Sequence, residues 1–385
     1  MDMSIVQKIC FLILMLVLST PLNGDDNTYN VTDYGAVADG TTDNTQPFMD
    51  TWKAACSSGG TMVIPAAGGN FLVNKIELEG PCSGQVTFQL DGVIVAPSGN
   101  SYPDSWFTFH AIDGFTMQGS GMFDGNGPSA WAQCPVCSAS IGLYAITNAH
   151  IQDITSLNSK GFHFVMVGGE GVTFEHINIT APGDSPNTDG INMAQSNNIQ
   201  IIDSDIGTGD DCVAIEEGCT NINVTGVNCG PGHGISIGSI GKLEADKDVQ
   251  GVYVQHCTLT STQNGVRIKS WAPSYPVTVS NVTYEDITIN NASNPIIIDQ
   301  TYCYDNKECP GESQVRISNV KYIGVTGTSA SQVAVSLQCS NNVPCQDIYL
   351  ENIDLTLSGG GQTSSQCVNA NVTYSGTQNP PPCNQ

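Results

Sequence analysis

A degenerate pattern of apolar residues, at relative positions 1, 3, 6 and often 8, recurs through the middle and the end of the chain. Val, Ile and Thr are common in these units, whereas Gly, Asn, Asp and Ser fall between them. This composition is typical of short strands that are separated by tight turns. The units are Val172–Ile179, Ile199–Ile206, Ile222–Val227, Val252–Leu259, Val282–Ile289, Val315–Tyr322 and Ile348–Leu355.

The spacing of the units predicts a solenoid. Successive units begin 27, 23, 30, 30, 33 and 33 residues apart, and a repeat of this length is typical of stacked coils. A sandwich or barrel would show hairpin turns every ~8 to 12 residues instead. We therefore predict an all-β parallel β-helix, in which equivalent positions on adjacent coils lie ~4.8 Å apart.

The two ends of the solenoid have patterns of their own. Asn44–Cys56 shows a helical period and is predicted to cap the N-terminal end of the core. The tail after Gly359 is polar and Pro-rich, and we expect Cys367 and Cys383 to pin it as a terminal cap.

The first residues predict a secretory signal peptide over 1–24. Lys8 precedes the apolar run Ile9–Leu18, and Pro21 marks a turn after it. Ten residues are too few to span a bilayer of ~30 Å, although a retained membrane anchor is the alternative. We predict that 25–385 is a single β-helix domain, because the repeats continue through it. The mature chain is expected to be secreted to the extracellular space or cell wall, without a membrane partner.

The cysteines support an oxidising compartment. Loss of Cys10 with the signal leaves fourteen of the fifteen, which predicts a fully disulfide-bonded protein. The pair Cys134 and Cys137 is interpreted as structural, with a redox motif as the alternative. Six glycosylation sequons agree with secretion; they begin at Asn30, Asn178, Asn223, Asn281, Asn291 and Asn371.

The formal net charge of −25 argues against a nucleic-acid partner, because phosphate binding needs clustered Lys and Arg. The sequence has eleven basic residues, so a place where two of them gather is informative. Arg267 and Lys269 alternate along one predicted strand and therefore share a face. Two cations aimed at one spot in so acidic a chain suggest an anionic ligand.

Three polar residues recur at the coil spacing. Asp189 and Asp211 are 22 residues apart, as are Asp211 and His233, and each lies in a Gly-rich break. Stacked coils would bring them, with the adjacent Asp210, to one place beside Arg267 and Lys269. Tyr302 lies 33 residues beyond Lys269, about one coil further. Each motif alone is typical of a solvated turn, an exposed strand face or a structural histidine; the agreement of their spacing with the apolar repeat indicates a site.

The motifs Asn187–Asp189, Gly209–Asp211, Gly232–Gly234 and Arg267–Lys269 resemble, in this order, the four signatures of the polygalacturonases of glycoside hydrolase family 28. The resemblance extends from Tyr34 to the cysteine-rich tail. It implies a right-handed single-stranded parallel β-helix that hydrolyses α-1,4-galacturonosyl bonds of pectic homogalacturonan with inversion. The chain is expected to be a monomer and to need no metal or cofactor.

The resemblance also implies residue roles. Asp210 would be the general acid, and Asp189 and Asp211 would hold and deprotonate the attacking water. His233 would help to set protonation. The substrate-binding residues would be Asn187, Gly234, Arg267, Lys269 and Tyr302, and Cys212 would pair with Cys229.

Two segments, Met122–Trp131 and Gly241–Val249, look more like those of pollen-type exopolygalacturonases, several of which are allergens. They favour exo action, with an endo-polygalacturonase as the alternative. A pectate lyase, which needs Ca²⁺ and an Arg base, is disfavoured by the Asp-Asp and Gly-His-Gly motifs. A specificity for rhamnogalacturonan or xylogalacturonan, and an inactive solenoid that only binds pectin, are the remaining alternatives.

Overall fold

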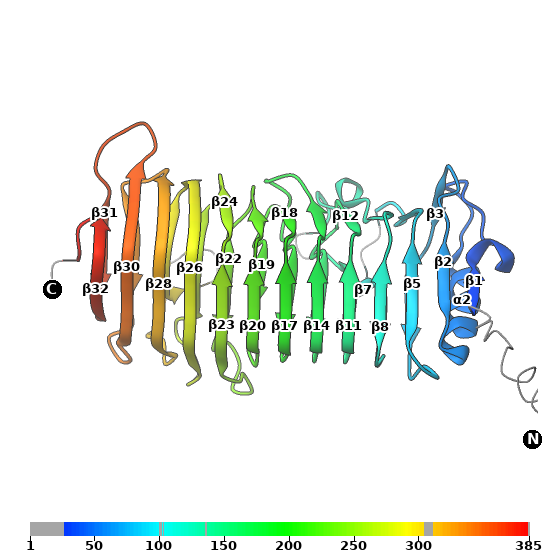
Figure 1. Ribbon diagram of the computed structural model, residues 1–385, viewed down its shortest axis with the longest axis horizontal. Coiled ribbons are helices and arrows are strands. Elements are labelled where there is room, and N and C mark those ends of the chain that lie inside the picture. The colour runs from blue at the N-terminus through cyan, green and yellow to red at the C-terminus, as the bar shows by residue number, and fades with distance from the viewer. Residues whose placement is uncertain (1–26, 100–101, 103, 135–136, 304–310, 384–385) are drawn as a thin grey trace, which may run out of the picture.

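The computed structural model describes residues 27–99, 102, 104–134, 137–303 and 311–383. The chain forms a long stack of coils, with the first and last strands at opposite ends (Figure 1). The predicted all-β fold, a right-handed parallel β-helix, is confirmed. The predicted signal peptide, residues 1–24, lies outside the described residues. In the part of the chain that is described, no helix has the length and apolar character needed to cross a membrane.

Three rows of parallel strands build the coils. Within the first row, the longest strands lie toward the C-terminus. This row comprises β1 (Thr28–Asn30), β2 (Thr61–Ile64), β5 (Val86–Leu90), β8 (Phe115–Gln118), β11 (Thr147–Gln152), β14 (Glu170–Glu175), β17 (Asn197–Ile202), β20 (Thr220–Thr225), β23 (Val249–Gln255), β26 (Thr278–Ala292), β28 (Arg316–Ser329), β30 (Cys345–Leu357) and β32 (Ala370–Asn379).

The second row consists of short strands and joins the first at β26, which pairs with both β23 and β24. It comprises β3 (Asn70–Leu72), β6 (Val93–Val95), β9 (Met122–Asp124), β12 (Thr155–Leu157), β15 (Asn178–Thr180), β18 (Asp205–Gly207), β21 (Asn228–Cys229) and β24 (Thr258–Thr260).

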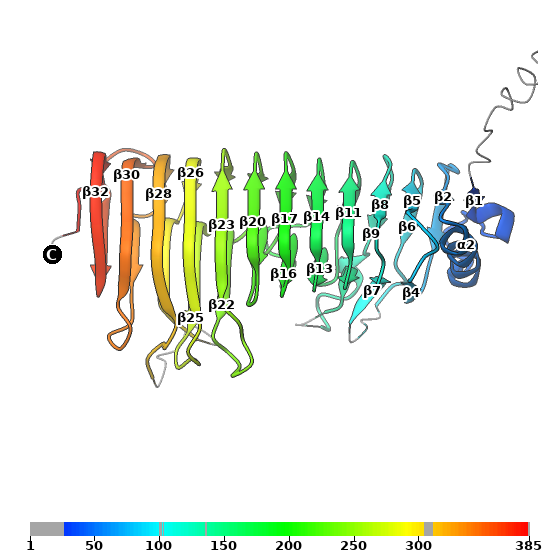
Figure 2. The same ribbon diagram turned by 60° about the horizontal axis from the view of Figure 1, so that its bottom comes forward.

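The third row is a separate sheet, here called the site sheet (Figure 2). It comprises β4 (Ile76–Glu79), β7 (Ser105–His110), β10 (Ala139–Tyr144), β13 (Phe164–Val167), β16 (Ile191–Ala194), β19 (Val213–Ile215), β22 (Ile235–Ile240), β25 (Asn264–Trp271), β27 (Asn294–Tyr302), β29 (Val333–Gln338) and β31 (Ser364–Val368).

Single residues in the left-handed conformation turn the chain from the first row to the second. Their φ angles lie between 44° and 70°, which Gly, Asn, Asp and His adopt more readily than other residues. This requirement explains the polar residues that interrupt the apolar units. On successive coils the corner residues are Asp153, His176, Asp203, Gly226, His256 and Asp286.

Inward side chains of equivalent positions stack along the core. Val172, Ile199, Ile222, Val252 and Val282 are paired from coil to coil, and each is at most 1% exposed. The predicted apolar repeat therefore coincides with the interior of the β-helix up to this coil.

The predicted repeat unit Val315–Tyr322 is in the wrong frame. Val282 pairs with Val320 and Val320 with Ile348, so the coil partner of Val282 is not Val315. The 1, 3, 6, 8 pattern almost repeats after five residues within a long strand. Val315 and Ile317 are buried as Val320 and Tyr322 are, so a frame displaced by five residues fits the apolar pattern equally well.

Both ends are closed as expected. The helix α2 (Thr45–Ser58) lies at the N-terminal end (Figure 1), buries Phe48 and Trp52, and is held by the Cys56–Cys82 disulfide. Elsewhere in the described residues the helical turns are η1 (Val31–Tyr34) and η2 (Gly127–Ser129). At the other end a disulfide joins Cys367 to Cys383 across the last coil, which β31 and β32 form.

The expectation that every mature cysteine is disulfide-bonded is wrong. Cys219 and Cys257 are free and buried. The strands β20 and β23 pair along a stretch of six residues. Cys219 lies just before this stretch on the chain of β20, and Cys257 lies after it on the chain of β23. A six-residue stretch is ~20 Å long, so the two thiols cannot meet in a disulfide. The other described bonds include Cys134–Cys137 and Cys339–Cys345.

Candidate active site

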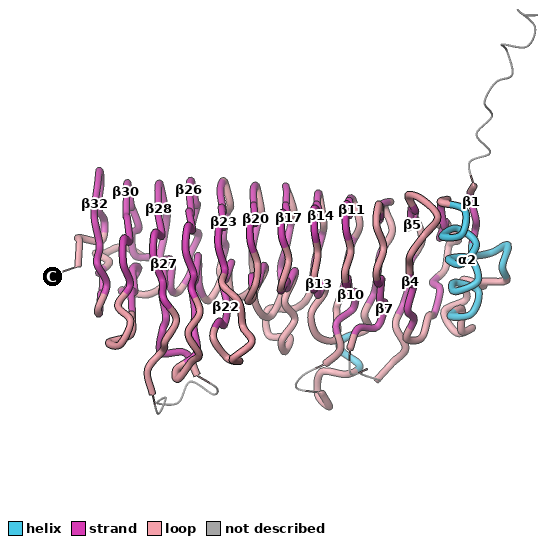
Figure 3. The backbone as a smooth tube through the Cα atoms, turned by 90° about the horizontal axis from the view of Figure 1, so that it is seen from below, coloured by secondary structure: helices cyan, strands magenta, loops and turns pink. Residues whose placement is uncertain are grey.

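The site lies on the outward face of the site sheet, where the register makes β16, β19, β22 and β25 neighbours. Figure 3 shows the sheet from below, with β13, β22 and β27 labelled. The register pairs Ile191 with Val213 and Val213 with Ile235. Two positions before these residues are Asp189, Asp211 and His233, on three successive coils. The stacking that the 22-residue steps predict is therefore confirmed.

Gly232 and Gly234 hold His233 in place through close backbone packing. Their φ angles are 148° and 96°, and a Cβ on Gly234 would lie 2.3 Å from the carbonyl oxygen of Asn264. The backbone N–H of His233 donates to the Asp210 carbonyl over 2.7 Å. Gly234 was predicted to bind substrate, but it is not among the described residues that line the pocket.

A pocket of about 410 Å³ opens over these strands. Its walls contain the remaining predicted catalytic and binding residues, which are Asn187, Asp189, Asp210, Asp211, His233, Arg267, Lys269 and Tyr302. The predicted Cys212–Cys229 disulfide is present directly beneath, and it joins the coil of Asp211 to the next turn of the chain.

Asp211 is buried and surrounded by donors. Its Oδ1 accepts from Arg267 Nη2 over 2.7 Å and from Ser236 Oγ over 2.8 Å, and its Oδ2 accepts from Lys269 Nζ over 3.0 Å. Burial alone would raise the pKa of Asp211, but the charges of Arg267 and Lys269 outweigh it and lower this pKa to about 2. Asp211 is therefore a fixed negative charge.

Asp189 has the opposite environment. It is 5% exposed, and its Oδ2 accepts a hydrogen bond from Asn192 Nδ2 over 3.0 Å. Burial and the charges of Asp210 and Asp211 raise the pKa of Asp189 well above its ordinary value. The group therefore retains a proton at acidic pH.

Asp210 is the most accessible of the three aspartates, with 23% of its side chain exposed. Its Oδ1 accepts from His233 Nδ1 over 2.8 Å and from the backbone N–H of Asp211 over 2.9 Å. Among the described residues no group donates to its Oδ2. This oxygen is therefore the one that can exchange a proton with a bound molecule.

The cations are paired with Asp211 but keep donors for a ligand. Arg267 uses Nε on Ser236 and Nη2 on Asp211, and within the described chain Nη1 has no partner. Lys269 uses one of its three N–H groups on Asp211 and lies 5.4 Å from the centroid of the Tyr302 ring. An anion in the pocket can thus be bound without breaking the ion pairs.

Sequence reasoning missed several residues in or next to the pocket. Asn192 and Ser236 each lie three positions after a motif residue, on the outward side of the strand that follows, so alternation along the strand could have indicated them. Glu216 and Asp299 also line the pocket. Asn264 donates to the His233 carbonyl and accepts from Asn294, which extends the polar wall to the next coils.

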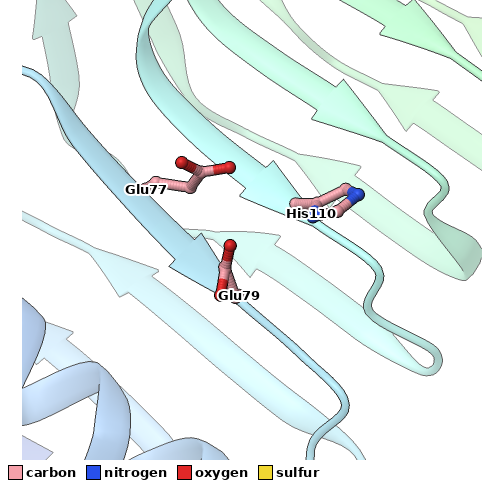
Figure 4. A group of neighbouring side chains, drawn as sticks. All are labelled: Glu77, Glu79 and His110. Carbon is pink, nitrogen blue, oxygen red and sulfur yellow. The ribbon is translucent and has the colours of Figure 1, made fainter.

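Two groups of side chains in the described part of the chain have donor sets that suit a metal ion. The first, Asp210, Asp211 and His233, lies in the pocket, but Arg267 and Lys269 already occupy the Asp211 oxygens. The second, Glu77, Glu79 and His110, projects from β4 and β7 near the N-terminal end, outside the pocket (Figure 4).

The family model for glycosyl hydrolases family 28 matches residues 56–376. An exopolygalacturonase of Platanus acerifolia is 41% identical over 367 residues, covering 92% of this chain and 97% of that protein. A polygalacturonase of Gossypium hirsutum is 42% identical over 389 residues, covering 97% and 94%. The endo-xylogalacturonan hydrolase of Aspergillus tubingensis has the same fold, with a TM-score of 0.79 at 24% identity over 91% of this chain and 100% of that one.

Proposed function

Because this chain belongs to family 28 of the glycosyl hydrolases, we propose that it hydrolyses α-1,4-galacturonosyl bonds of homogalacturonan with inversion of configuration. The observation that carries the proposal is the group Asp189, Asp210 and Asp211 beside the cations Arg267 and Lys269 in one pocket. An inverting glycosidase needs one carboxylic acid for the leaving oxygen and one carboxylate for the water.

Asp210 is the general acid in this proposal. Its Oδ2 is open toward the pocket, while His233 and the Asp211 amide hold Oδ1. A proton on Oδ2 can pass to the glycosidic oxygen as the C–O bond breaks. His233 orients this carboxyl, so we expect its replacement to reduce turnover without removing the acid itself.

Asp189 is the base. The charge of Asp210 is one of the causes that raise the pKa of Asp189, so a proton on Asp210 removes this cause and favours the ionised form of Asp189. With Asp210 protonated, Asp189 accepts a proton from water as the oxygen attacks the anomeric carbon. Asp211 remains ionised beside Arg267 and Lys269, where it positions the water and stabilises positive charge on the sugar ring.

Arg267 and Lys269 bind the carboxylate of the galacturonate unit, with Tyr302 against the sugar. The unused Arg267 Nη1 and the remaining Lys269 donors support this assignment. Asn187, which also lines the pocket, contacts the substrate.

We further propose exo action by a secreted enzyme. The two segments that resemble pollen-type enzymes each contact a neighbour of a pocket residue. Trp131 Nε1 donates to the carbonyl of Ser159, whose Oγ donates to the carbonyl of the pocket residue Phe162. Lys242 lies 4.9 Å from the ring of Trp271, which packs against the pocket residue Tyr302. The disulfides Cys56–Cys82 and Cys212–Cys229 agree with an oxidising compartment.

Product analysis on polygalacturonate tests the proposal. We expect reducing ends to appear, with monomer as the first product and the inverted anomer visible before mutarotation in proton NMR. A ladder of oligomers from the start would contradict exo action. An unsaturated product that absorbs in the near ultraviolet, or no release at all, would contradict hydrolysis.

A further inference from the structure

Glu216 is a carboxyl in the pocket that the proposed chemistry does not use. It follows β19 directly, and strand alternation places it on the outward face with Ala214, while Val213 and Ile215 are inside. The same pocket wall contains Lys269 and Asp299.

Glu216 lies in a row of outward residues that crosses the neighbouring coils. The register aligns Glu216 with Ala194 on one neighbouring coil and with Gly238 on the other. Lys269 follows Gly238 in the same row, and Asp299 pairs with Lys269 on the next coil. Glu216, Lys269 and Asp299 all line the pocket, so a sugar bound there can lie beside Glu216.

Glu216 has no partner that would fix its charge. In the described structure its carboxyl makes no hydrogen bond or ion pair, whereas Lys269 is paired with Asp211. Its neighbour Glu217 is different: Glu217 accepts from Gln195 Nε2 over 2.6 Å and from the Lys247 N–H over 3.1 Å, and it does not line the pocket.

We propose that Glu216 sets the charge preference of the pocket: a neutral Glu216 admits an ionised uronate beside Lys269, and an ionised Glu216 favours a methyl-esterified unit there. This inference rests on the proposed function. Its physical basis is that an ionised carboxyl repels a substrate carboxylate, whereas a protonated one can donate a hydrogen bond to it.

The groups around Glu216 determine the pH at which its carboxyl changes from neutral to ionised, and this pH lies near neutrality. Burial raises the pKa of Glu216 to about 7 against the attraction of Lys269, and the charges of Asp211, Asp246 and Glu217 add to the rise. Asp299 lines the pocket from the far side of Lys269. The pocket therefore accepts a fully ionised substrate below about pH 7 and discriminates against it above.

The test compares the wild-type protein with Glu216→Gln, which is neutral at every pH and similar in shape. KM for polygalacturonate is measured at about pH 5.5 and about pH 8. We expect equal values at the lower pH and a wild-type KM roughly tenfold higher than that of the variant at the upper pH, as for two unit charges ~6 Å apart in a wet pocket. With partially methyl-esterified pectin as the substrate, the difference in KM between the wild type and the variant should be smaller.

Glu217→Gln is the matched control, because it removes the neighbouring charge outside the pocket; its KM should follow the wild type at both values of pH. A ratio of wild-type to Glu216→Gln KM that does not change with pH would overturn the inference while leaving hydrolysis intact. Absence of reducing-end release by the wild type at either pH would instead contradict the proposed function.

Discussion

Asp189, Asp210 and Asp211 have identical side chains in one pocket, but their neighbours give them different properties. Two cations and Ser236 surround the carboxylate of Asp211, whereas Asp189 is buried against the charges of the other two. The pKa is lowered for Asp211 and raised for Asp189. Asp211 therefore stays ionised, while the charge of Asp210 is one cause of the raised pKa of Asp189, so that these two carboxyls are coupled.

Asp189→Asn should stabilise the folded protein at pH 6 while it removes activity. A carboxyl whose pKa is raised by folding costs stability above its unfolded pKa of ~3.9, because the unfolded state then releases a proton that the folded state retains. The gain in Tm should vanish near pH 3, where both states are protonated. Thermal unfolding of the variant and the wild type between pH 3 and pH 6 measures this difference in Tm.

Asp184→Asn is the control for that experiment, because Asp184 is exposed in the loop before the site. Its Tm should follow the wild type at every pH. Equal Tm values for Asp189→Asn and the wild type at pH 6 would contradict the raised pKa.

At this scale the sequence predicts the motif residues but not their pairing. The spacing of Asp189, Asp211 and His233 follows from the coil length, which the apolar pattern reveals. The contact of Asp211 with Arg267 and Lys269 depends on side-chain direction across two coils. The position of Glu216 in the pocket depends on its register with the neighbouring coils, which no motif marks.

The long strands toward the C-terminus contribute a stacked pair of tyrosines to the core. Tyr284 of β26 and Tyr322 of β28 are stacked in the core with ring centroids 5.1 Å apart. Both hydroxyls are buried without a hydrogen-bond partner among the described residues. An unsatisfied buried hydroxyl costs free energy that the ring stacking does not return.

Tyr322→Phe should therefore raise the free energy of unfolding by about 1 kcal/mol. Chemical denaturation measures the change. Tyr349→Phe on the next coil is the control, because the Tyr349 hydroxyl donates to Glu351 over 2.8 Å and its loss should give no gain. A destabilised Tyr322→Phe variant would show that the hydroxyl has a partner.

The disulfide next to the catalytic coils makes a second prediction at the element scale. Cys212 and Cys229 are separated by 17 residues, and loss of a cross-link of this length costs ~3 kcal/mol. The double variant Cys212→Ala and Cys229→Ala should unfold at lower temperature and turn over more slowly, because Asp211 precedes Cys212. The pair Cys134 and Cys137, separated by 3 residues, should matter much less to stability.

The order of the elements could be predicted from the sequence over more of the chain than the frame of the repeat units. The repeat indicates coils, and the helix over Asn44–Cys56 agrees with α2 within two residues. The frame fails at Val315 because the inward pattern of β28 matches itself after a shift of five residues. Backbone pairing, which apolar positions alone do not encode, decides between the two frames.

At the scale of the whole molecule, the acidic charge opposes the proposed substrate. The formal net charge is −25, so a polyanion such as polygalacturonate is repelled at a distance even though the pocket binds one unit. Repulsion between exposed charges is screened over ~30 Å at 0.01 M salt and ~10 Å at 0.1 M.

KM for polygalacturonate should therefore fall as ionic strength rises over this interval, while kcat changes little. Initial rates at several substrate concentrations provide both constants. A KM that increases with salt would indicate a basic groove that attracts the polymer, which is opposite to the charge distribution described here.

The central claim is that the stacked aspartates hydrolyse galacturonan, and Asp210→Asn tests it most directly. The initial rate of reducing-end release from polygalacturonate is compared between this variant and the wild type, with thermal unfolding as the check on folding. We expect turnover to fall by about 10³-fold or more at an unchanged Tm, since the amide cannot protonate the leaving oxygen. A folded variant whose rate stays within about tenfold of the wild type would contradict the account.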